Sequence, residues 1–302
     1  MTERSLPRTS SRPSDSSPRI PGLNPRKVTL VPWCTTAAVG EELLSGGLAN
    51  AGAVVRSGPH VLRPATPHAP SIHRFLASLE RSGFERAPVP VGLDPDGRER
   101  LSFIDGDVPV PPYPDWAQSD SVLASAADLM RRFHTAASGF DPSPMAWNTE
   151  LADPAGGMVV CHNDVCLENV VFRDGRAVAL IDFDFAAPGR SLFDLACFAR
   201  MCVPIDDDVS ASRLGWHDAD RGHRLRLVAE SYGLGIAERA ELLGPVDRSM
   251  QVGGEFVRRR AETGDPSFVK VWAEMGGQQR FDRRRDWWAQ HRPHIESTVL
   301  AS

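Results

Sequence analysis

The sequence predicts an α+β protein of two lobes, in which a small antiparallel sheet precedes a larger, mainly helical region. Its 302 residues are enough to bury a large core and suggest about two domains or lobes. Short apolar runs between turn signals fill residues 28–105, whereas apolar residues at helical spacing dominate residues 106–302. Hydrophobic residues make up 41% and charged residues 24% of the chain, as is usual for a globular protein.

Residues 1–27 stand outside these two lobes. They are rich in Ser, Pro and Arg and lack apolar periodicity, so we expect a disordered tail. No signal sequence or membrane-spanning run is recognisable, and five cysteines, an odd number, do not suggest a disulfide framework. A net charge of −5 argues against a general nucleic-acid binder. We therefore expect a cytoplasmic protein whose partners include neither a membrane nor nucleic acid.

Residues 28–105 are expected to form the smaller lobe from short strands and one helix. The turn Ser57-Gly58 lies between two apolar runs and predicts a hairpin, and Asp96-Gly97 predicts a second one. Between them, a stretch of helical spacing begins at Pro70 and ends at Gly83. The prolines that follow this region mark the boundary to the second lobe.

The larger lobe, residues 106–302, is expected to be mainly helical. A serine cap at position 119 or 121 begins a helix that Gly139 ends. Apolar periodicity predicts further helices over residues 192–201, 224–232, 237–262 and 266–290.

The most informative motif for function is His-x-Asp-x-x-x-x-Asn, formed by His162, Asp164 and Asn169, with Asp182 following 13 positions after the Asn. Phosphoryl transfer from a nucleoside triphosphate needs a carboxylate that accepts a hydroxyl proton, and an Asn and an Asp that hold Mg²⁺ against the phosphates. Asp174-Gly175 predicts a tight hairpin that would bring Asn169 beside Asp182. Two oxygen ligands would then meet at one point, as a hard cation requires.

These residues have candidate roles and simpler alternatives. Asp164 is the candidate general base, and a turn or cap aspartate is the alternative. Asn169 and Asp182 are candidate Mg²⁺ ligands, and the cost of burying an Asp without a cation favours the metal interpretation for Asp182. Asp184 either contacts a second metal ion or is structural. Asp194 is expected to brace the loop that carries the base.

This region resembles the aminoglycoside phosphotransferase family of small-molecule kinases, within the protein-kinase-like superfamily. The family shows His-Gly-Asp-x-x-x-x-Asn, then Ile-Asp-Trp/Phe-x-x-Ala and Asp-Leu-Ala. The corresponding residues here run from His162 to Asn169, from Ile181 to Ala186, and from Asp194 to Ala196. A weaker pattern extends the resemblance over residues 28–290.

The resemblance implies a bilobal protein-kinase-like fold with ATP or GTP in the cleft between the lobes and Mg²⁺ as cofactor. It places a glycine loop for the phosphates at Gly46-Gly47 and a hinge for the adenine over residues 101–104, where Phe103 and Ile104 offer backbone groups. It also implies transfer of the γ-phosphoryl group to a hydroxyl of a small molecule, either an aminoglycoside-like antibiotic or a metabolite. A role in antibiotic resistance is one option.

Four departures from the family pattern lie at the catalytic and nucleotide sites. The phosphate loop consists only of the pair Gly46-Gly47, which is a weak signal by itself. Asn163 stands where the family has Gly. No lysine lies on the expected third strand, because the only lysines among 34 basic residues are Lys27 and Lys270; Arg63 occupies the matching position. Arg clasps phosphates with two donors and is always charged, but its geometry differs from that of Lys. The helix after Pro70 also has no Glu in its first turn to pair with this Arg.

Other functions are left open by the sequence. The missing Lys and Glu suggest a catalytically impaired nucleotide-binding module as the main alternative. An apolar strand ending in Asp182-Phe183-Asp184 also occurs in haloacid-dehalogenase-type phosphatases, although the fold context disfavours them. A protein kinase would need a longer segment before Asp194 for a peptide to dock on. The acidic run Asp206-Asp207-Asp208 either attracts a cationic acceptor or is a solvated loop. Neither the acceptor nor the oligomeric state follows from the sequence.

Overall fold

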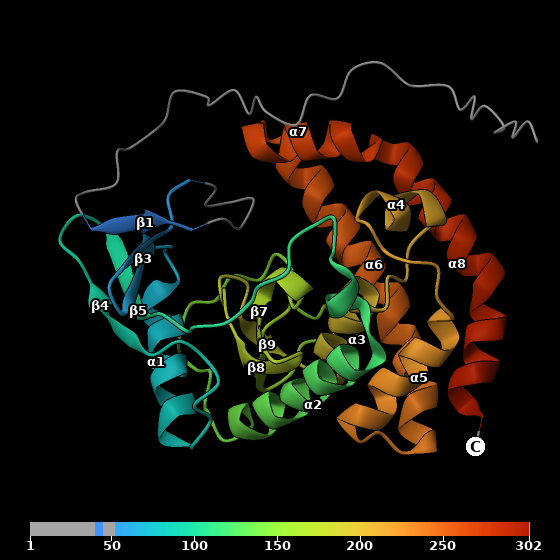
Figure 1. The fold of residues 1–302 in the computed structure, drawn as a ribbon, viewed down its shortest axis with the longest axis horizontal. Helices are drawn as coiled ribbons and strands as arrows, with labels where there is room; N and C mark the ends of the chain where they lie inside the picture. The colour runs from blue at the N-terminus through green and yellow to red at the C-terminus, as the bar shows by residue number, and fades with distance from the viewer. Residues whose placement is uncertain (1–39, 45–51, 302) are drawn as a thin grey trace, which may run out of the picture. The chain divides into compact units, whose positions relative to one another are not determined.

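A computed structural model describes residues 40–44 and 52–301 of the chain. These residues form a small antiparallel sheet and a large helical part, so the predicted α+β class is confirmed (Figure 1). The tail expected over residues 1–27 and the glycine pair Gly46-Gly47 lie outside the described residues. No helix within the described ranges is long and apolar enough to cross a membrane.

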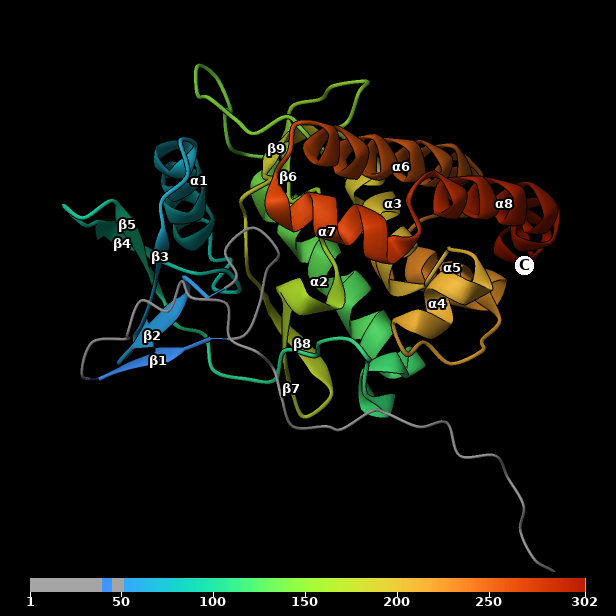
Figure 2. The same ribbon diagram turned by 90° about the horizontal axis from the view of Figure 1, so that it is seen from above.

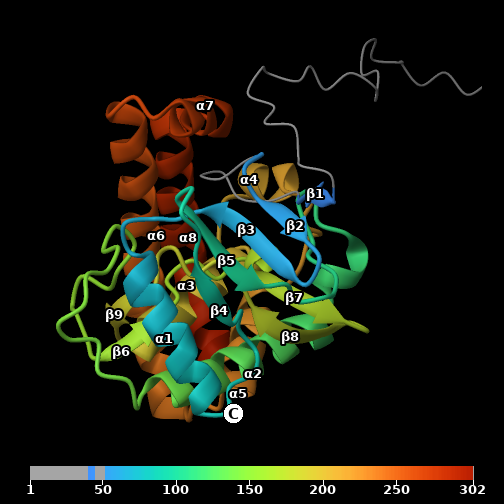
Figure 3. The ribbon, with the colours of Figure 1, turned by 90° about the vertical axis from the view of Figure 1, so that its left-hand side faces the viewer.

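The smaller part is a five-stranded antiparallel sheet. Its strands are β1 (Glu41–Leu43), β2 (Val55–Ser57), β3 (His60–Pro64), β4 (Pro90–Leu93) and β5 (Arg98–Ser102). They lie in the order β1-β2-β3-β5-β4, which places β3 in the centre (Figure 3). Both expected hairpins form, with Gly58 in the β2-β3 turn and Gly97 in the β4-β5 turn at positive φ.

One helix, α1 (Ala69–Arg81), packs beside β4 in the predicted place. Its apolar face is buried, with Phe75 fully enclosed. The ring of Phe75 meets those of Phe133 and Phe183 edge-on, with centroids 6.1 and 6.4 Å apart. Because Phe133 and Phe183 belong to the helical part, one continuous core joins the two parts.

The chain enters the helical part alongside strand β7 (Val170–Arg173). Asp107 and Phe172 form an isolated antiparallel bridge, with N–H···O distances of 2.8 Å in both directions. Gly106 has a φ of +149°, and a Cβ atom there would lie 2.5 Å from the Val171 side chain and 2.6 Å from the Phe172 carbonyl oxygen. Only glycine fits this crossing. The sheet is thereby tied to the strand that follows Asn169.

The larger part combines helices with two small sheets of two strands each. β6 (Val159–Cys161) pairs with β9 (Ala187–Gly189), and β7 pairs with β8 (Arg176–Leu180) across Asp174-Gly175, as predicted. The helices are α2 (Asp120–Ala137), α3 (Ser191–Cys202), α4 (Asp208–Arg213), α5 (Arg221–Tyr232), α6 (Ile236–Glu262), α7 (Pro266–Met275) and α8 (Gly277–Leu300). Figure 2 shows the five-stranded sheet and α1 on one side, α4 to α8 on the other, and the small sheets with α2 between them.

One helical prediction needs correction, and one short helix has no counterpart among the predictions. The stretch 266–290, expected as one helix, is divided into α7 and α8. Gly276 and Gly277 adopt φ values of 91° and 54°, so the first helix ends in a left-handed cap. Helix α4 is not predicted because it has only six residues; it begins where Asp207 accepts a hydrogen bond from the Ser210 N–H.

Candidate active site

The motif loop, residues 162–169, is fixed by one buried carboxylate. Asp194 of α3 accepts hydrogen bonds from the backbone N–H groups of His162 and Asn163, both at 2.7 Å. His134 of α2 also contacts it at 2.9 Å. Burial would raise the pKa of Asp194, but these hydrogen bonds and the nearby histidines hold that pKa below its usual value. Asp194 is therefore ionised and braces the loop.

Asn163 lets the loop keep its shape without the family's glycine. Its φ is 64°, in the left-handed region that Gly favours and that Asn tolerates better than most residues. Its side-chain nitrogen donates to the Phe185 carbonyl oxygen at 3.0 Å. The Asn thus preserves the backbone path and links the loop to the segment after Asp184.

His162 is fully buried and holds the loop from within. One ring nitrogen lies 2.9 Å from the Ile181 carbonyl oxygen, and the other lies 3.4 Å from the Asp164 backbone nitrogen. Burial lowers the pKa of His162 below its usual value in spite of the charge on Asp194. A neutral ring that donates to Ile181 and accepts from Asp164 satisfies both contacts. His162 therefore orients the loop with both of its nitrogens engaged.

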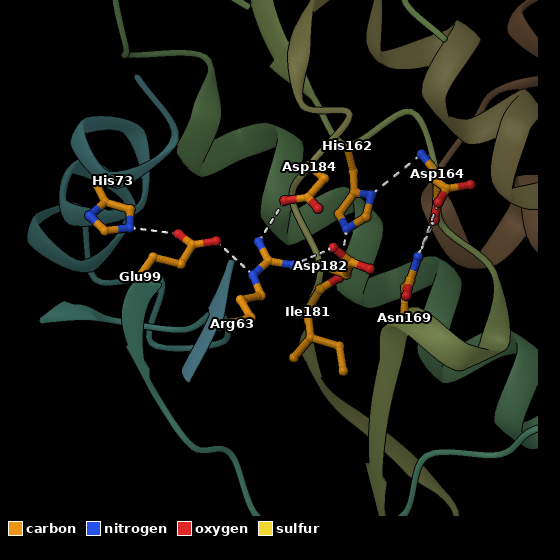
Figure 4. A network of polar contacts seen from close by, with 9 residues as sticks. All are labelled: Arg63, His73, Glu99, His162, Asp164, Asn169, Ile181, Asp182 and Asp184. Atoms are coloured by element: carbon orange, nitrogen blue, oxygen red, sulfur yellow. Dashed lines mark hydrogen bonds and ion pairs between the residues drawn. The ribbon is translucent and has the colours of Figure 1, made fainter. Parts of the chain in front are cut away.

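The β7-β8 hairpin brings Asn169 beside the second acidic segment, as predicted. The Ile181 N–H donates to the Asn169 carbonyl oxygen at 2.9 Å. The side-chain nitrogen of Asn169 donates to the Asp164 carbonyl oxygen at 2.7 Å and lies 3.4 Å from the Asp164 carboxylate. Because this nitrogen is engaged, Asn169 would offer its side-chain oxygen to a cation. Figure 4 shows Asp164, Asn169 and Asp182 gathered in one region.

The surroundings of Asp164 disfavour its charged form. Burial and the negative charge of Asp182 raise the pKa of Asp164 to about 7, although the positive charge of Arg200 opposes them. Asp182 itself has a φ of 63°, which is uncommon outside glycine. Backbone strain of this kind concentrates at functional sites.

Arg63 joins the sheet to the acidic segment. Its Nε donates to Glu99 at 2.6 Å, its Nη1 to Asp182 at 2.7 Å and its Nη2 to Asp184 at 2.6 Å. Figure 4 shows the guanidinium between these three carboxylates. Burial would lower the pKa of Arg63, but the three negative charges raise it above its usual value. Arg63 thus lies on β3 as predicted, with carboxylates as its partners.

Two further residues, Glu99 and His73, are linked to Arg63 and are not predicted from the sequence. Glu99 of β5 is 1% exposed, and its second oxygen lies 2.7 Å from Nε2 of His73 on α1. Burial would raise the pKa of Glu99, but the His73 hydrogen bond and the Arg63 charge lower it. The sequence suggests a partner of Arg63 within α1, whereas Glu99 lies on β5. The feature that points to Glu99 is an acidic residue at the position opposite Arg63 in the neighbouring strand. We call Arg63, His73, Glu99, Asp182 and Asp184 the Arg63 network.

The charges of the Arg63 network fit a divalent cation. Three carboxylates surround one guanidinium, so acidic groups outnumber the guanidinium around it. Burial and the carboxylates of Asp182 and Glu99 raise the pKa of Asp184 in spite of Arg63, as expected where positive charge is short. The Asp182 side chain is 32% exposed and remains accessible. Its oxygens and that of Asn169 are the ligands that Mg²⁺ prefers.

The residues expected to meet the adenine follow β5. The Phe103 N–H donates to the Pro59 carbonyl oxygen at 2.8 Å, and the Arg56 guanidinium lies 3.9 Å from the centre of the Phe103 ring. This N–H is thus engaged within the sheet. Among the residues that the structure describes, the Ile104 backbone has no hydrogen-bond partner, so Ile104 suits the expected role better than Phe103. The other part of the expected nucleotide site, Gly46-Gly47, is outside these residues.

The acidic run considered for a cationic acceptor is occupied by arginines. Asp207 also serves as the cap of α4. The ion pairs join the run to α5 and α8, so these carboxylates bind the helices together and offer little net charge to a ligand. The three pairs are Asp206–Arg280, Asp207–Arg283 and Asp208–Arg221.

Comparison with known proteins assigns the family. The chain is 30% identical over 271 residues to the trifolitoxin immunity protein of Rhizobium leguminosarum bv. trifolii, and the match covers 86% of this chain and 98% of that protein. A model described as the phosphotransferase enzyme family matches residues 145–227, which contain the motif loop and the β7-β8 hairpin. The chain belongs to the phosphotransferase enzyme family.

Solved structures show that this phosphotransferase has the bilobal protein-kinase-like fold. A choline/ethanolamine kinase family protein from Mesorhizobium loti superposes with a TM-score of 0.57 at 17% identity, covering 89% of this chain and 95% of that one. An amicoumacin kinase in complex with AMP-PNP, Ca²⁺ and Ami superposes with a TM-score of 0.56 at 10% identity, covering 87% and 90%. The predicted fold and family are confirmed, and membership of the family makes this chain a phosphotransferase.

Proposed function

We propose that this protein transfers the γ-phosphoryl group of ATP or GTP, bound with Mg²⁺, to a hydroxyl of a small molecule in the cytoplasm. One observation carries the proposal: Asp164, Asn169 and Asp182 converge, with Arg63 of β3 in contact with Asp182. A base, two metal ligands and a phosphate-binding cation are the groups that this reaction requires. Residues 28–105 would form the nucleotide lobe and residues 106–302 the catalytic lobe.

In this proposal Asp164 orients the acceptor hydroxyl and accepts its proton as the phosphoryl group leaves the nucleotide. A pKa of about 7 suits a group that accepts a proton near neutral pH. The contacts of Asp194 with the loop backbone keep the carboxylate of Asp164 in a fixed place. Positioning of this kind accounts for much of the rate enhancement in phosphoryl transfer.

Asn169 and Asp182 would hold the Mg²⁺ ion, which neutralises phosphate charge when it is bound. We assign Asp184, which also pairs with Arg63, to a second ion. Arg63 would exchange some of its hydrogen bonds with the carboxylates for hydrogen bonds with the phosphates, because the guanidinium binds both groups in the same bidentate manner.

The rest of the nucleotide site is proposed from the sequence pattern. Phe103 and Ile104 would meet the base with backbone groups, and Gly46-Gly47 would lie over the phosphates. The alternative, an impaired nucleotide-binding module, rests on the missing Lys and Glu. The 2.6 Å ion pair between Arg63 on β3 and Glu99 on β5 provides a cation and a carboxylate in their stead, which argues against this alternative.

For the acceptor we favour an antibiotic-like small molecule and a role in resistance. One support is the similarity to the trifolitoxin immunity protein, of which the match covers 98%. The other is the similarity in fold to an amicoumacin kinase whose structure contains AMP-PNP, Ca²⁺ and Ami. The arginine-paired acidic run gives no reason to expect a strongly cationic acceptor. A metabolite with a free hydroxyl is the alternative, so a turnover screen should include both classes.

Nucleotide binding tests the proposal first. Calorimetry with non-hydrolysable analogues of ATP and GTP is expected to show binding in Mg²⁺ that is lost in EDTA. Asp182→Ala should abolish this metal-dependent binding, because it removes a ligand that Asn169 alone cannot replace. Binding of Mg·AMP-PNP by Asp182→Ala with wild-type affinity would show that the metal assignment is wrong.

Turnover tests the base. Asp164→Asn is expected to bind nucleotide but to lose roughly 10²–10⁴-fold in kcat, because the acceptor proton has no carboxylate to receive it. The exposed loop variant Asp141→Asn is the matched control and should keep wild-type kcat. Equal turnover by Asp164→Asn and wild type would remove Asp164 from the reaction.

A further inference from the structure

The carboxylate that binds Arg63 comes from the neighbouring strand. Arg63 on β3 and Glu99 on β5 are direct cross-strand partners, and the Arg63 Nε donates to Glu99 Oε1 at 2.6 Å. In protein kinases the cation on this strand is paired instead with a Glu on the adjacent helix, whose position controls activity. The corresponding helix here, α1, provides His73, which contacts Glu99 at 2.7 Å.

The planar guanidinium of Arg63 has donors in fixed directions. When Glu99 holds Nε, the two Nη atoms are aimed at Asp182 and Asp184 (Figure 4). The same two Nη atoms are the ones that would meet nucleotide phosphates. Arg63 is 5% and Glu99 1% exposed, so water competes little for the contact between them.

We propose that Glu99 is the positioning residue for Arg63 and that His73 in turn orients Glu99. The inference rests on the proposed nucleotide-binding role of Arg63 and adds its means of control. The phosphate-binding arginine is anchored inside the sheet, in a register fixed by backbone pairing. Its orientation therefore depends on α1 only through the hydrogen bond from His73 to Glu99.

Glu99→Gln tests the inference, since it keeps the shape of the side chain and removes its charge. The affinity for Mg·AMP-PNP, measured by calorimetry, is expected to fall about tenfold or more. The affinity for adenosine, which has no phosphates, should stay at the wild-type value. Asp94→Asn is the matched control: it breaks the 2.8 Å ion pair with Arg100 in the same hairpin and should change neither affinity.

A second measurement observes Arg63 without any nucleotide. Hydrogen exchange of the arginine Nε–H groups can be followed by ¹⁵N NMR, with the Arg63 signal assigned from its loss in Arg63→Lys. We expect a protected Nε–H in the wild type and faster exchange in Glu99→Gln. His73→Ala should give partial loss of protection, whereas His73→Gln, which retains a side-chain N–H donor, should keep it.

The outcomes separate the inference from the proposed function. If the wild type binds neither nucleotide analogue, the proposed function fails, and the exchange rates still test whether Glu99 holds Arg63. Wild-type affinity and wild-type exchange in Glu99→Gln would overturn the inference. Equal losses of AMP-PNP and adenosine binding would also overturn it, because Glu99 would then support the fold and not the orientation of Arg63. If Glu99→Gln does not fold, exchange in His73→Ala decides: faster exchange supports the inference and unchanged exchange overturns it.

Discussion

At the scale of single residues, the family motif predicts those site residues that lie at a fixed spacing along the chain. Asp164, Asn169 and Asp182 belong to one such spacing, and the structure brings them together. Glu99 and His73 could not be found in this way, because their contacts depend on which strand lies beside β3 and on how α1 packs. Their residue types are common on surfaces, and only the tertiary register makes Glu99 a buried partner of Arg63.

Asp194 gives a prediction for pH and stability. Its pKa is lowered in the folded protein from the reference value of 3.8. Its contribution to stability is therefore present above the unfolded-state pKa and is lost as pH falls through the lower folded-state value. Asp194→Asn is expected to reduce the free energy of unfolding at pH 7 by roughly 3 kcal/mol, because backbone N–H groups and His134 lose a charged acceptor.

Urea denaturation of the wild type and Asp194→Asn at several pH values provides the measurement. The difference in unfolding free energy between them should narrow below about pH 4, where the unfolded wild-type carboxylate takes up a proton. A difference that stays constant between pH 7 and pH 3 would mean that the charge of Asp194 does not stabilise the loop.

At the scale of elements, turn chemistry is what the sequence reports best. Asp174 and Gly175 have φ values of 51° and 69°, as their pairing in a tight hairpin requires. Gly175→Ala should lower the free energy of unfolding by about 1–2 kcal/mol, because alanine is strained at positive φ. It should also weaken Mg·AMP-PNP binding, because this hairpin aligns Asn169 with Asp182. Thermal unfolding and calorimetry measure the two effects.

The matched control for that variant is Gly139→Ala. Gly139 has no positive φ, and a Cβ there would meet nothing within 4 Å. We expect no loss of stability and no change in nucleotide affinity. If Gly175→Ala behaves in the same way as Gly139→Ala, the hairpin does not determine the position of the proposed metal ligands.

Helix boundaries show where element predictions fail. The helical spacing of residues 266–290 continues across Gly276 and Gly277, so periodicity alone does not reveal the break between α7 and α8. The break appears only in the backbone, where both glycines leave the helical region. Periodicity reports which face of a helix is apolar, and it is less informative about where the helix stops.

At the scale of the whole molecule, the two lobes share a core. Phe75 of α1 is 0% exposed and packs on Phe133 and Phe183. We therefore expect the two lobes to unfold in a single transition when unfolding is monitored by circular dichroism and by tryptophan fluorescence. Phe75→Ala should lower the unfolding free energy by about 3–5 kcal/mol. Two separate transitions in the wild type would contradict this shared core.

The order of the lobes follows from the sequence, because strands and helices have different apolar periods. The contact between lobes does not, since it is made by residues far apart in the chain, such as Arg63 and Asp182. The disordered tail over residues 1–27 stays a prediction, as does the role of Gly46-Gly47.

The use of arginine on β3 has a consequence for chemical labelling. Reagents that acylate amines from a nucleotide phosphate depend on a lysine beside that phosphate. The described part of this chain holds one lysine, Lys270 on the exposed surface of α7, where it pairs with Glu274. Such reagents should therefore find no amine to modify among the described residues of the proposed nucleotide site. A dicarbonyl reagent selective for guanidinium groups, with nucleotide as protectant, is the probe suited to it.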